Sequence, residues 1–379
     1  MKLSDYSEGR DNNFNLIRIL AAYAVFITHS YALSVGSGSA EPAIKNIDLS
    51  LGMVAVDIFF ITSGFLVTAS LLNRDSIIDF IWARVLRIYP ALIVMLFLTT
   101  FGLGVFFTTL PWSSYISDSQ VYKYLLKCSS LIGGVSFNLP GVFEPNPYKN
   151  AVNGSLWSMP WEVRMYAFLA LFGLVIGVLC KDRIKKLKIL KIIIIFSVIM
   201  AAIFLSYYHF IASGKSCYLK LYVLFFSGAL YYILKNKIEL SRKIFISIIF
   251  IFVISTINKH TFYFLYILTL PYILFYIAYI PSGFIRKYNK LDDYSYGVYI
   301  YAFPIQQSFA ALIPGISVLQ LIIFSTISTF IMAYLSWHII EKHALRLKKD
   351  YSDNTKKLFV YFLKKTTHQL SRQTQSWRV

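Results

Sequence analysis

Charged residues are scarce in this sequence. Only 15% of its 379 residues are Asp, Glu, Lys or Arg, whereas 57% are hydrophobic. A soluble domain carries about a quarter charged residues, and with so few it could not cover its core with polar surface. Cysteine is also rare, and Cys128, Cys180 and Cys217 have no C-x-x-C spacing. We therefore expect a membrane protein with neither a disulfide framework nor a metal site.

Long apolar stretches, by contrast, are abundant. They predict an all-α polytopic membrane protein with about ten transmembrane helices, an even number that places both termini on one side. The leader before the first stretch carries three acidic residues, which argues against a cleavable signal peptide. The predicted spans are residues 14–34, 52–72, 90–109, 156–179, 191–209, 217–234, 243–257, 261–280, 295–313 and 316–340.

The basic residues indicate which side the termini occupy. If the N-terminus is cytoplasmic, 28 of the 37 Lys and Arg residues lie in inner segments and 7 in outer ones, Lys220 among the latter. This excess is the positive-inside bias, so both termini are expected in the cytoplasm of a bacterial inner-membrane protein. The formal charge of +19 then reflects topology and contact with membrane lipid, and no nucleic-acid partner is expected. Residues 1–345 form the membrane domain, and residues 346–379 form a basic cytoplasmic tail that lies on the membrane or is disordered.

Few ionisable residues fall within the predicted spans, and each is a candidate functional residue because charge is costly there. Arg18 lies about one turn inside the first span, and His29 follows eleven residues later, about 16 Å further along a helix. Asp57 and Glu162 enter from the outer side at similar depth. Purely structural roles are the alternative for these residues. Arg18 would then extend to lipid headgroups, and Asp57 would cap a helix or pair with Arg164.

Five motifs, in order, resemble the family-3 membrane acyltransferases. The first is the Arg-x10-His pattern of FNLIRILAAYAVFITHSYAL, and the second is VDIFFITSGFLVTASL. The others are FIWARVLRIYPAL, GSLWSMPWEVRMYAFLALF and the late pair DYSYGVYIYAFPIQQ and IIEKHALRL. The resemblance runs from residue 14 to about 346. Two features depart from the family: Ala302 stands where many members have histidine, and no esterase-like domain follows the last span.

The resemblance implies transfer of an acyl group, most often acetyl, from cytoplasmic acetyl-CoA to a hydroxyl of an extracytoplasmic glycan. Arg18, Arg84 and Arg87 would bind the CoA phosphates, because guanidinium groups form bidentate bonds to phosphate. Arg84 and Arg87 could alternatively be ordinary positive-inside anchors. The acceptor is expected to be a lipid-linked surface polysaccharide such as O-antigen.

His29 is the candidate general base, since neutral imidazole titrates near working pH. Glu162, or less favourably Asp57, would orient the imidazole, although a transient acyl-histidine is the alternative mechanism. Trp157 and Tyr166 are candidate sugar-binding residues, and Ser63 more readily serves helix packing than catalysis. The remaining histidines are expected to be bystanders: His209, His260, His338, His343 and His368.

A transporter or flippase of a lipid-linked saccharide is the competing function. It also accommodates ten spans and buried charges. It further predicts inverted repeats or paired Gly/Pro-broken spans, and the sequence contains neither. The arginines aligned with His29 would have no role in it, so the acyltransferase interpretation is favoured.

Overall fold

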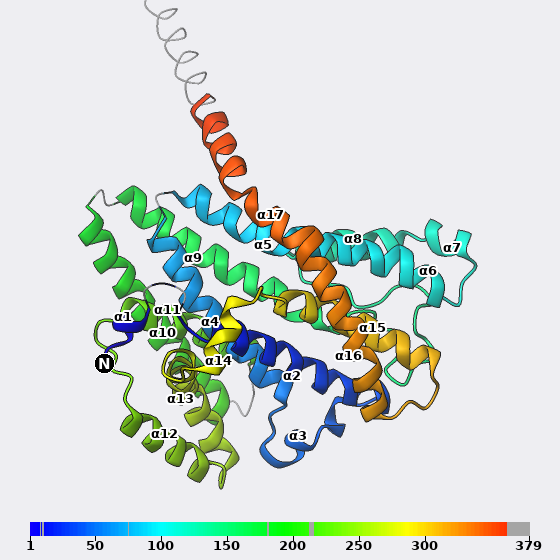
Figure 1. Ribbon diagram of the computed structural model, residues 1–379, viewed down its shortest axis with the longest axis horizontal. Coiled ribbons are helices and arrows are strands. Elements are labelled where there is room, and N and C mark those ends of the chain that lie inside the picture. Colours follow the sequence, from blue (N-terminus) through cyan, green and yellow to red (C-terminus); the bar gives the residue numbers. More distant parts are fainter. Residues whose placement is uncertain (8, 10, 75, 180–181, 212–215, 362–379) are drawn as a thin grey trace, which may run out of the picture.

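The computed structural model describes residues 1–7, 9, 11–74, 76–179, 182–211 and 216–361. These residues are almost entirely helical, and their only β-structure consists of isolated bridges (Figure 1). The predicted all-α class is therefore confirmed. The ten longest helices are α2 (Phe14–Val35), α4 (Leu51–Leu72), α5 (Ile77–Phe97), α9 (Met159–Leu179), α10 (Arg183–Phe210), α11 (Cys217–Ile233), α12 (Arg242–Ser255), α13 (Lys259–Tyr279), α15 (Ser295–Leu312) and α16 (Val318–Leu335).

Shorter helical elements connect the long ones. They include two π-helical turns, η2 after α5 and η5 after α16. These connecting elements are α1 (Leu3–Tyr6), η1 (Gly38–Ala40), α3 (Pro42–Ile47), η2 (Leu98–Leu103), α6 (Gly104–Phe107), α7 (Trp112–Ser117), α8 (Ser119–Ser130), η3 (Gly154–Ser158), α14 (Phe284–Lys287), η4 (Tyr288–Lys290), η5 (Ser336–Glu341) and α17 (Lys342–Arg346).

Each of the ten predicted spans corresponds to a helix. Among the described residues, seven helical segments are long and apolar enough to cross a membrane, which makes this a multi-pass membrane protein. The other three predicted spans fall on α11, α12 and α15, with 17, 14 and 18 residues. The number ten and the cytoplasmic termini stay predictions. The seven segments are Phe14–Val35, Leu51–Leu72, Ile77–Phe107, Gly154–Gly177, Lys185–Phe210, Lys259–Tyr279 and Val318–Tyr361.

The third span begins earlier than predicted. Its helix starts at Ile77, where the Ser76 side chain accepts a hydrogen bond from the Ile78 amide, and Pro90 lies inside it. A helix in a packed bundle can tolerate such a proline. As a consequence, Arg84 and Arg87 are residues of α5 rather than of a preceding loop.

Helix α4 is the central element, and glycine permits its closest contact. A Cβ atom on Gly64 would lie 1.8 Å from the carbonyl oxygen of Phe225 in α11, and one on Gly228 would lie 2.1 Å from that of Ile61. Small residues at both positions let the two backbones touch. The packing role expected for the Ser63–Gly64 pair is thus performed by Gly64.

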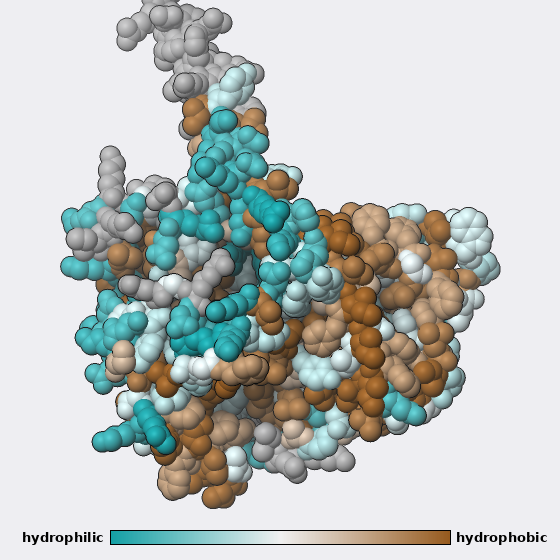
Figure 2. All heavy atoms as spheres, in the orientation of Figure 1, coloured by the Kyte–Doolittle hydropathy of each residue, from teal (hydrophilic) through white to brown (hydrophobic). Residues whose placement is uncertain are grey.

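Apolar side chains cover much of the outer surface. Phe106, Ile192, Phe196 and Phe250 each expose more than 60% of their surface, as expected for residues that face lipid. Figure 2 shows such residues over a broad part of one face, with hydrophilic residues gathered around the base of the C-terminal helix.

The described part of the predicted tail is helical. Residues 348–361 continue from α17 and extend away from the helical body in Figure 1. The rest of the tail, from residue 362, lies outside the described residues.

Candidate functional site

A cavity of about 310 Å³ lies among α2, α4, α5, α9 and the start of α15. All three arginines that were expected to bind the donor line it, as do two of the other candidate residues, Glu162 and Tyr166. Its polar lining includes Arg18, Arg84, Arg87, Glu162, Tyr166 and Asp293. We refer to it as the inner cavity. His29, Asp57 and Trp157 do not line it.

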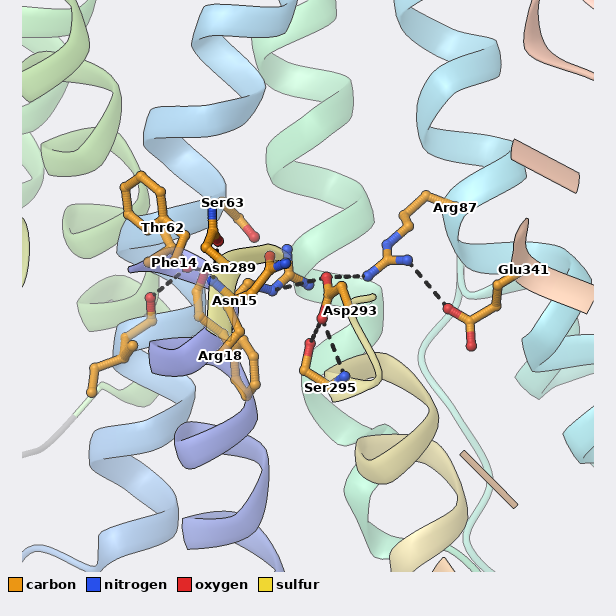
Figure 3. A network of polar contacts seen from close by, with 12 residues as sticks. Phe14, Asn15, Arg18, Thr62, Ser63, Arg87, Asn289, Asp293, Ser295 and Glu341 are labelled. Carbon is orange, nitrogen blue, oxygen red and sulfur yellow. Dashed lines mark hydrogen bonds and ion pairs between the residues drawn. The ribbon is translucent and has the colours of Figure 1, made fainter. Parts of the chain in front are cut away.

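Asp293 holds two of the arginines in place. Its Oδ2 atom lies 2.6 Å from an Arg87 nitrogen and 3.6 Å from Nε of Arg18, while Ser295 donates two bonds to Oδ1 (Figure 3). Arg87 also donates to Glu341 at 3.2 Å. Burial of Asp293 disfavours its charged form, but the two guanidinium groups and the Ser295 bonds outweigh this and lower its pKa to about 2. The carboxylate is therefore charged at working pH and orients both arginines.

Arg84 is placed differently. Its guanidinium lies 5.9 Å from the centre of the Tyr166 ring, and its buried Nε atom has no hydrogen-bond partner among the described residues. Within the described chain no ion pair joins Arg84 to a carboxylate, although Glu162 lines the same cavity. A buried cation of this kind favours an anionic ligand.

Glu162 belongs to a hydrogen-bonded group on the cavity wall. Its carboxylate accepts a bond from the Tyr166 hydroxyl, one turn along α9, and another from Ser63 at 3.2 Å. Ser63 therefore faces the cavity even though its neighbour Gly64 packs against α11. The position of Tyr166 beside Arg84 places this predicted sugar-binding residue on the inner cavity.

His29 lies further along α2, outside the inner cavity. Its Nδ1 atom is 3.4 Å from the Ser155 hydroxyl, and its ring packs edge-on against Phe303 at 5.0 Å. Among the described residues, no hydrogen bond or ion pair joins it to Glu162 or Asp57, the carboxylates that were expected to orient it. Ser155 is the polar partner that the described residues supply.

Short polar contacts connect His29 with the inner cavity. The Tyr299 hydroxyl donates to the Ser155 carbonyl at 2.5 Å and lies 2.7 Å from the Ser158 hydroxyl. Both Ser158 and Tyr299 line the inner cavity. Since Asn153 caps η3 by accepting a bond from the Ser155 amide, the five-residue element η3 places both serines.

A second cavity, of about 520 Å³, also borders η3. It is lined by Gly154 and Trp157 of η3, together with Asn138, Tyr148 and Lys149 from the predicted outer segment. We call it the outer cavity. Trp157, a predicted sugar-binding residue, thus lies apart from Tyr166. Gly154 is required because a Cβ atom there would lie 2.6 Å from the Phe303 ring.

Asp57 forms a separate buried cluster. Its Oδ2 atom accepts bonds of 2.8 Å from Lys220 of α11 and from Tyr266 of α13, and all three side chains are buried. Asp57 thus pairs neither with His29 nor with Arg164, whose guanidinium donates to the Ile132 carbonyl. Lys220, which was counted among the outer-loop cations, lies inside the helical bundle.

The histidines expected to be bystanders lie away from both cavities. His209 and His260 contact one another at 3.3 Å, and His338 contacts Tyr294. His343 is exposed on α17. His368 lies outside the described residues.

Sequence reasoning missed Asp293, Glu341, Ser155 and Tyr299. Each lies within a motif quoted above, yet none was assigned a role. The acidic residues of LDDYSYGVY and IIEKHALRL lie just outside the predicted spans, where charge is ordinary. The usable signal was the excess of arginines over acids at the inner face, since buried arginines need carboxylate partners.

Comparisons with known proteins agree with the resemblance. A family model described as an acyltransferase domain matches residues 11–339. The chain is 29% identical over 348 residues to the O-acetyl transferase of Shigella phage Sf6, covering 89% of this chain and 96% of that protein. It is 26% identical over 358 residues to the putative peptidoglycan O-acetyltransferase YrhL of Bacillus subtilis (strain 168), covering 85% and 55% of the two chains. Nodulation protein 10 of Rhizobium leguminosarum bv. viciae is 28% identical over 173 residues, which are 44% of this chain and 45% of that one. No solved structure matches.

Proposed function

The chain belongs to the family-3 membrane acyltransferases, and from this premise we propose that it transfers an acetyl group from cytoplasmic acetyl-CoA to a hydroxyl of an extracytoplasmic glycan. The acceptor proposed is a lipid-linked surface polysaccharide such as O-antigen, at the bacterial inner membrane. The observation that carries the proposal is the contact of His29 with Ser155 of η3, because other residues of this short element line both the cavity with the arginines and the outer cavity with the aromatic side chains.

The inner cavity is the proposed donor site. CoA carries several phosphates, and Arg84 offers a buried guanidinium without a hydrogen-bond partner at Nε among the described residues. Asp293 presents Arg18 and Arg87 in fixed orientations. Because Arg18 and His29 are eleven residues apart on α2, about 16 Å separates them along the helix. An extended pantetheine arm would cover this distance past Ser158 and Tyr299.

The outer cavity is the proposed acceptor site. Trp157 and Tyr148 offer flat faces for a sugar ring, and Asn138 and Lys149 offer polar groups. With the donor and the acceptor both beside η3, the thioester and a glycan hydroxyl would meet at His29.

His29 is proposed as the general base. Its imidazole would take the proton of the acceptor hydroxyl as that oxygen attacks the thioester carbonyl, and CoA would leave as the thiolate. Ser155, at 3.4 Å from Nδ1, would position the ring, a task that sequence reasoning gave to Glu162 or Asp57. An acyl-histidine intermediate is the alternative route, which a rapid-quench search for acetylated His29 would distinguish.

Turnover of acetyl-CoA by the purified protein tests the proposal, with membrane glycan extract as acceptor. We expect glycan-dependent release of CoA from the wild type and about a 1000-fold loss in His29→Ala, the middle of the range for a general base. His343→Ala, an exposed histidine on α17, is the matched control and should retain wild-type turnover. A wild-type protein that neither binds nor turns over acetyl-CoA would instead favour the transporter or flippase.

A further inference from the structure

The helix that follows α17 is attached to the start of α5. Asp79, in the first turn of α5, accepts bonds of 2.8 and 2.9 Å from the Lys356 ammonium and a further bond from the Ser352 hydroxyl. Ser352 is 1% exposed, while the Lys356–Asp79 ion pair beside it is partly exposed. The three residues form a clamp between two segments more than 270 positions apart in the sequence.

One turn further along α5, Trp82 extends the clamp. Its indole nitrogen donates to the Thr355 hydroxyl at 2.9 Å, and its ring lies 4.7 Å from the Tyr351 ring. Tyr351 and Thr355 are four residues apart and therefore share a face of the C-terminal helix. The attachment thus fixes the helix in rotation as well as position.

The same helix contributes to the inner cavity. Lys348 and Leu345 both line it, beside Arg84 and Arg87 of α5. Lys348 precedes Ser352 by four residues and Thr355 by seven, the spacing of a single helix face. Its neighbour Lys349 is exposed and does not line the cavity. The clamp therefore presents one specific lysine of the basic tail to the site.

We propose that the C-terminal helix is a wall of the donor site and that Lys348 binds a phosphate of the donor. A lysine ammonium is a compact cation suited to phosphate. It joins three arginines in a cavity where Asp293 already offsets the charges of Arg18 and Arg87. The proposal rests on the proposed function. It makes the C-terminal helix part of donor recognition, in which Lys348 favours a phosphate-bearing thioester over a phosphate-free one.

Equilibrium binding to the purified full-length chain tests the role of Lys348, with acetyl-CoA and the phosphate-free acetylpantetheine as probes. We expect Lys348→Gln to weaken acetyl-CoA binding about tenfold, the loss of one charge-assisted contact, and to leave acetylpantetheine binding unchanged. Lys349→Gln is the matched control and should bind both probes like the wild type. Equal acetyl-CoA affinity in Lys348→Gln and wild type, or equal weakening of both probes, would overturn the proposal.

The clamp is tested separately by Asp79→Ala. Release of the helix should weaken acetyl-CoA binding about threefold to tenfold without changing acetylpantetheine binding, because Lys348 is no longer held at the cavity. Asp350→Ala, an exposed acid on the same helix, is its control. Wild-type affinity in Asp79→Ala would overturn the role of the clamp. Failure of the proposed function looks different, because the wild type itself would then bind no acetyl-CoA.

Discussion

Two ion networks among the described residues differ in what surrounds them. In the first, Asp57 meets one lysine and one tyrosine, the charges balance, and neither Asp57 nor Lys220 lines the inner or the outer cavity. In the second, Asp293 meets Arg18 and Arg87 on the wall of the inner cavity, where Arg84 adds a further cation.

The difference shows why a buried charge alone does not identify a binding site. Asp57 is fully buried in a closed pair, whereas Asp293 lies on the wall of an open space into which the further cation Arg84 also faces. Asp57 was a catalytic candidate by sequence, yet its contacts are those of a structural pair that joins α4, α11 and α13. Asp293 was overlooked, yet it orients the proposed donor site. The two networks should therefore respond differently to mutation, one in stability and the other in ligand binding.

Asp293→Asn should produce the largest effect on donor binding. Removal of the carboxylate leaves Arg18 and Arg87 without the partner that orients them towards the donor. Loss of two charge-assisted ligand contacts is worth about 3 kcal/mol, or roughly 100-fold in affinity. Isothermal titration with acetyl-CoA measures the loss. Asp292→Asn is the control, since Asp292 makes only a partly exposed 3.6 Å ion pair with Lys342. If Asp293→Asn bound acetyl-CoA as tightly as the wild type, the Asp293 network would be structural like the Asp57 network.

Lys220→Met should mainly lower stability. It leaves Asp57 charged and buried without its cation, at a cost of about 3 kcal/mol. The double variant Asp57→Asn/Lys220→Met should recover most of this loss, because a well-packed neutral pair replaces the ion pair. Thermal unfolding in detergent measures both, and acetyl-CoA affinity of the double variant should match the wild type. Loss of turnover in a stable double variant would instead give Asp57 a catalytic role.

Arg84→Gln should weaken acetyl-CoA binding about tenfold with little change in unfolding temperature. The guanidinium makes no ion pair with the described chain, so its removal leaves no acid uncompensated, and the loss is that of one charge-assisted ligand contact. The control is Arg74→Gln, whose side chain bonds Ser70 and lines a different cavity. A strongly destabilised Arg84→Gln protein would indicate a structural role.

Acidification should have the smallest effect of these changes, because the Asp293 ion pairs lose their stabilising contribution only at low pH. The pKa of Asp293 lies near 2, below its usual 3.8, so the stability that its ion pairs contribute is complete above about pH 4 and is lost as the pH falls towards 2. Unfolding temperatures between pH 5 and pH 2 measure this. The difference in unfolding temperature between wild type and Asp293→Asn should become smaller only in the lower part of that range. A smaller difference already near pH 5 would contradict the lowered pKa of Asp293.

The sequence predicted the helical class well because long apolar runs can only be helices in a bilayer. It also singled out Arg18, Arg84, Arg87, Glu162 and Tyr166, all of which line the inner cavity, but it had assigned Glu162 to His29 and Tyr166 to the sugar. It could not predict partners. Whether Asp57 faces Lys220 or His29 depends on the rotation and crossing of three helices, which Gly64 and Gly228 control through a backbone contact.

Boundaries were less predictable for the same reason. The predicted third span began at residue 90, but the helix begins after the capping residue Ser76 and continues through Pro90 within the bundle. The tail was interpreted from its charge and its amphipathic patches. Its order depends on Asp79 and Trp82, more than 260 residues away, which no local pattern reveals.

The length of the last helix gives the protein a built-in marker of its orientation. The segment from Val318 to Tyr361 has 44 residues and is therefore about 66 Å long, more than twice the roughly 30 Å of a bilayer's hydrocarbon layer. Even the steepest tilts seen in membrane proteins, about 40°, would leave a large part of it in water. A reactive probe placed near Tyr361 would thus report from one side of the membrane only. The side on which it is labelled is also the side that holds the start of α5, because Lys356 of the same helix contacts Asp79 there, and the direction of α5 through the membrane follows from that single observation.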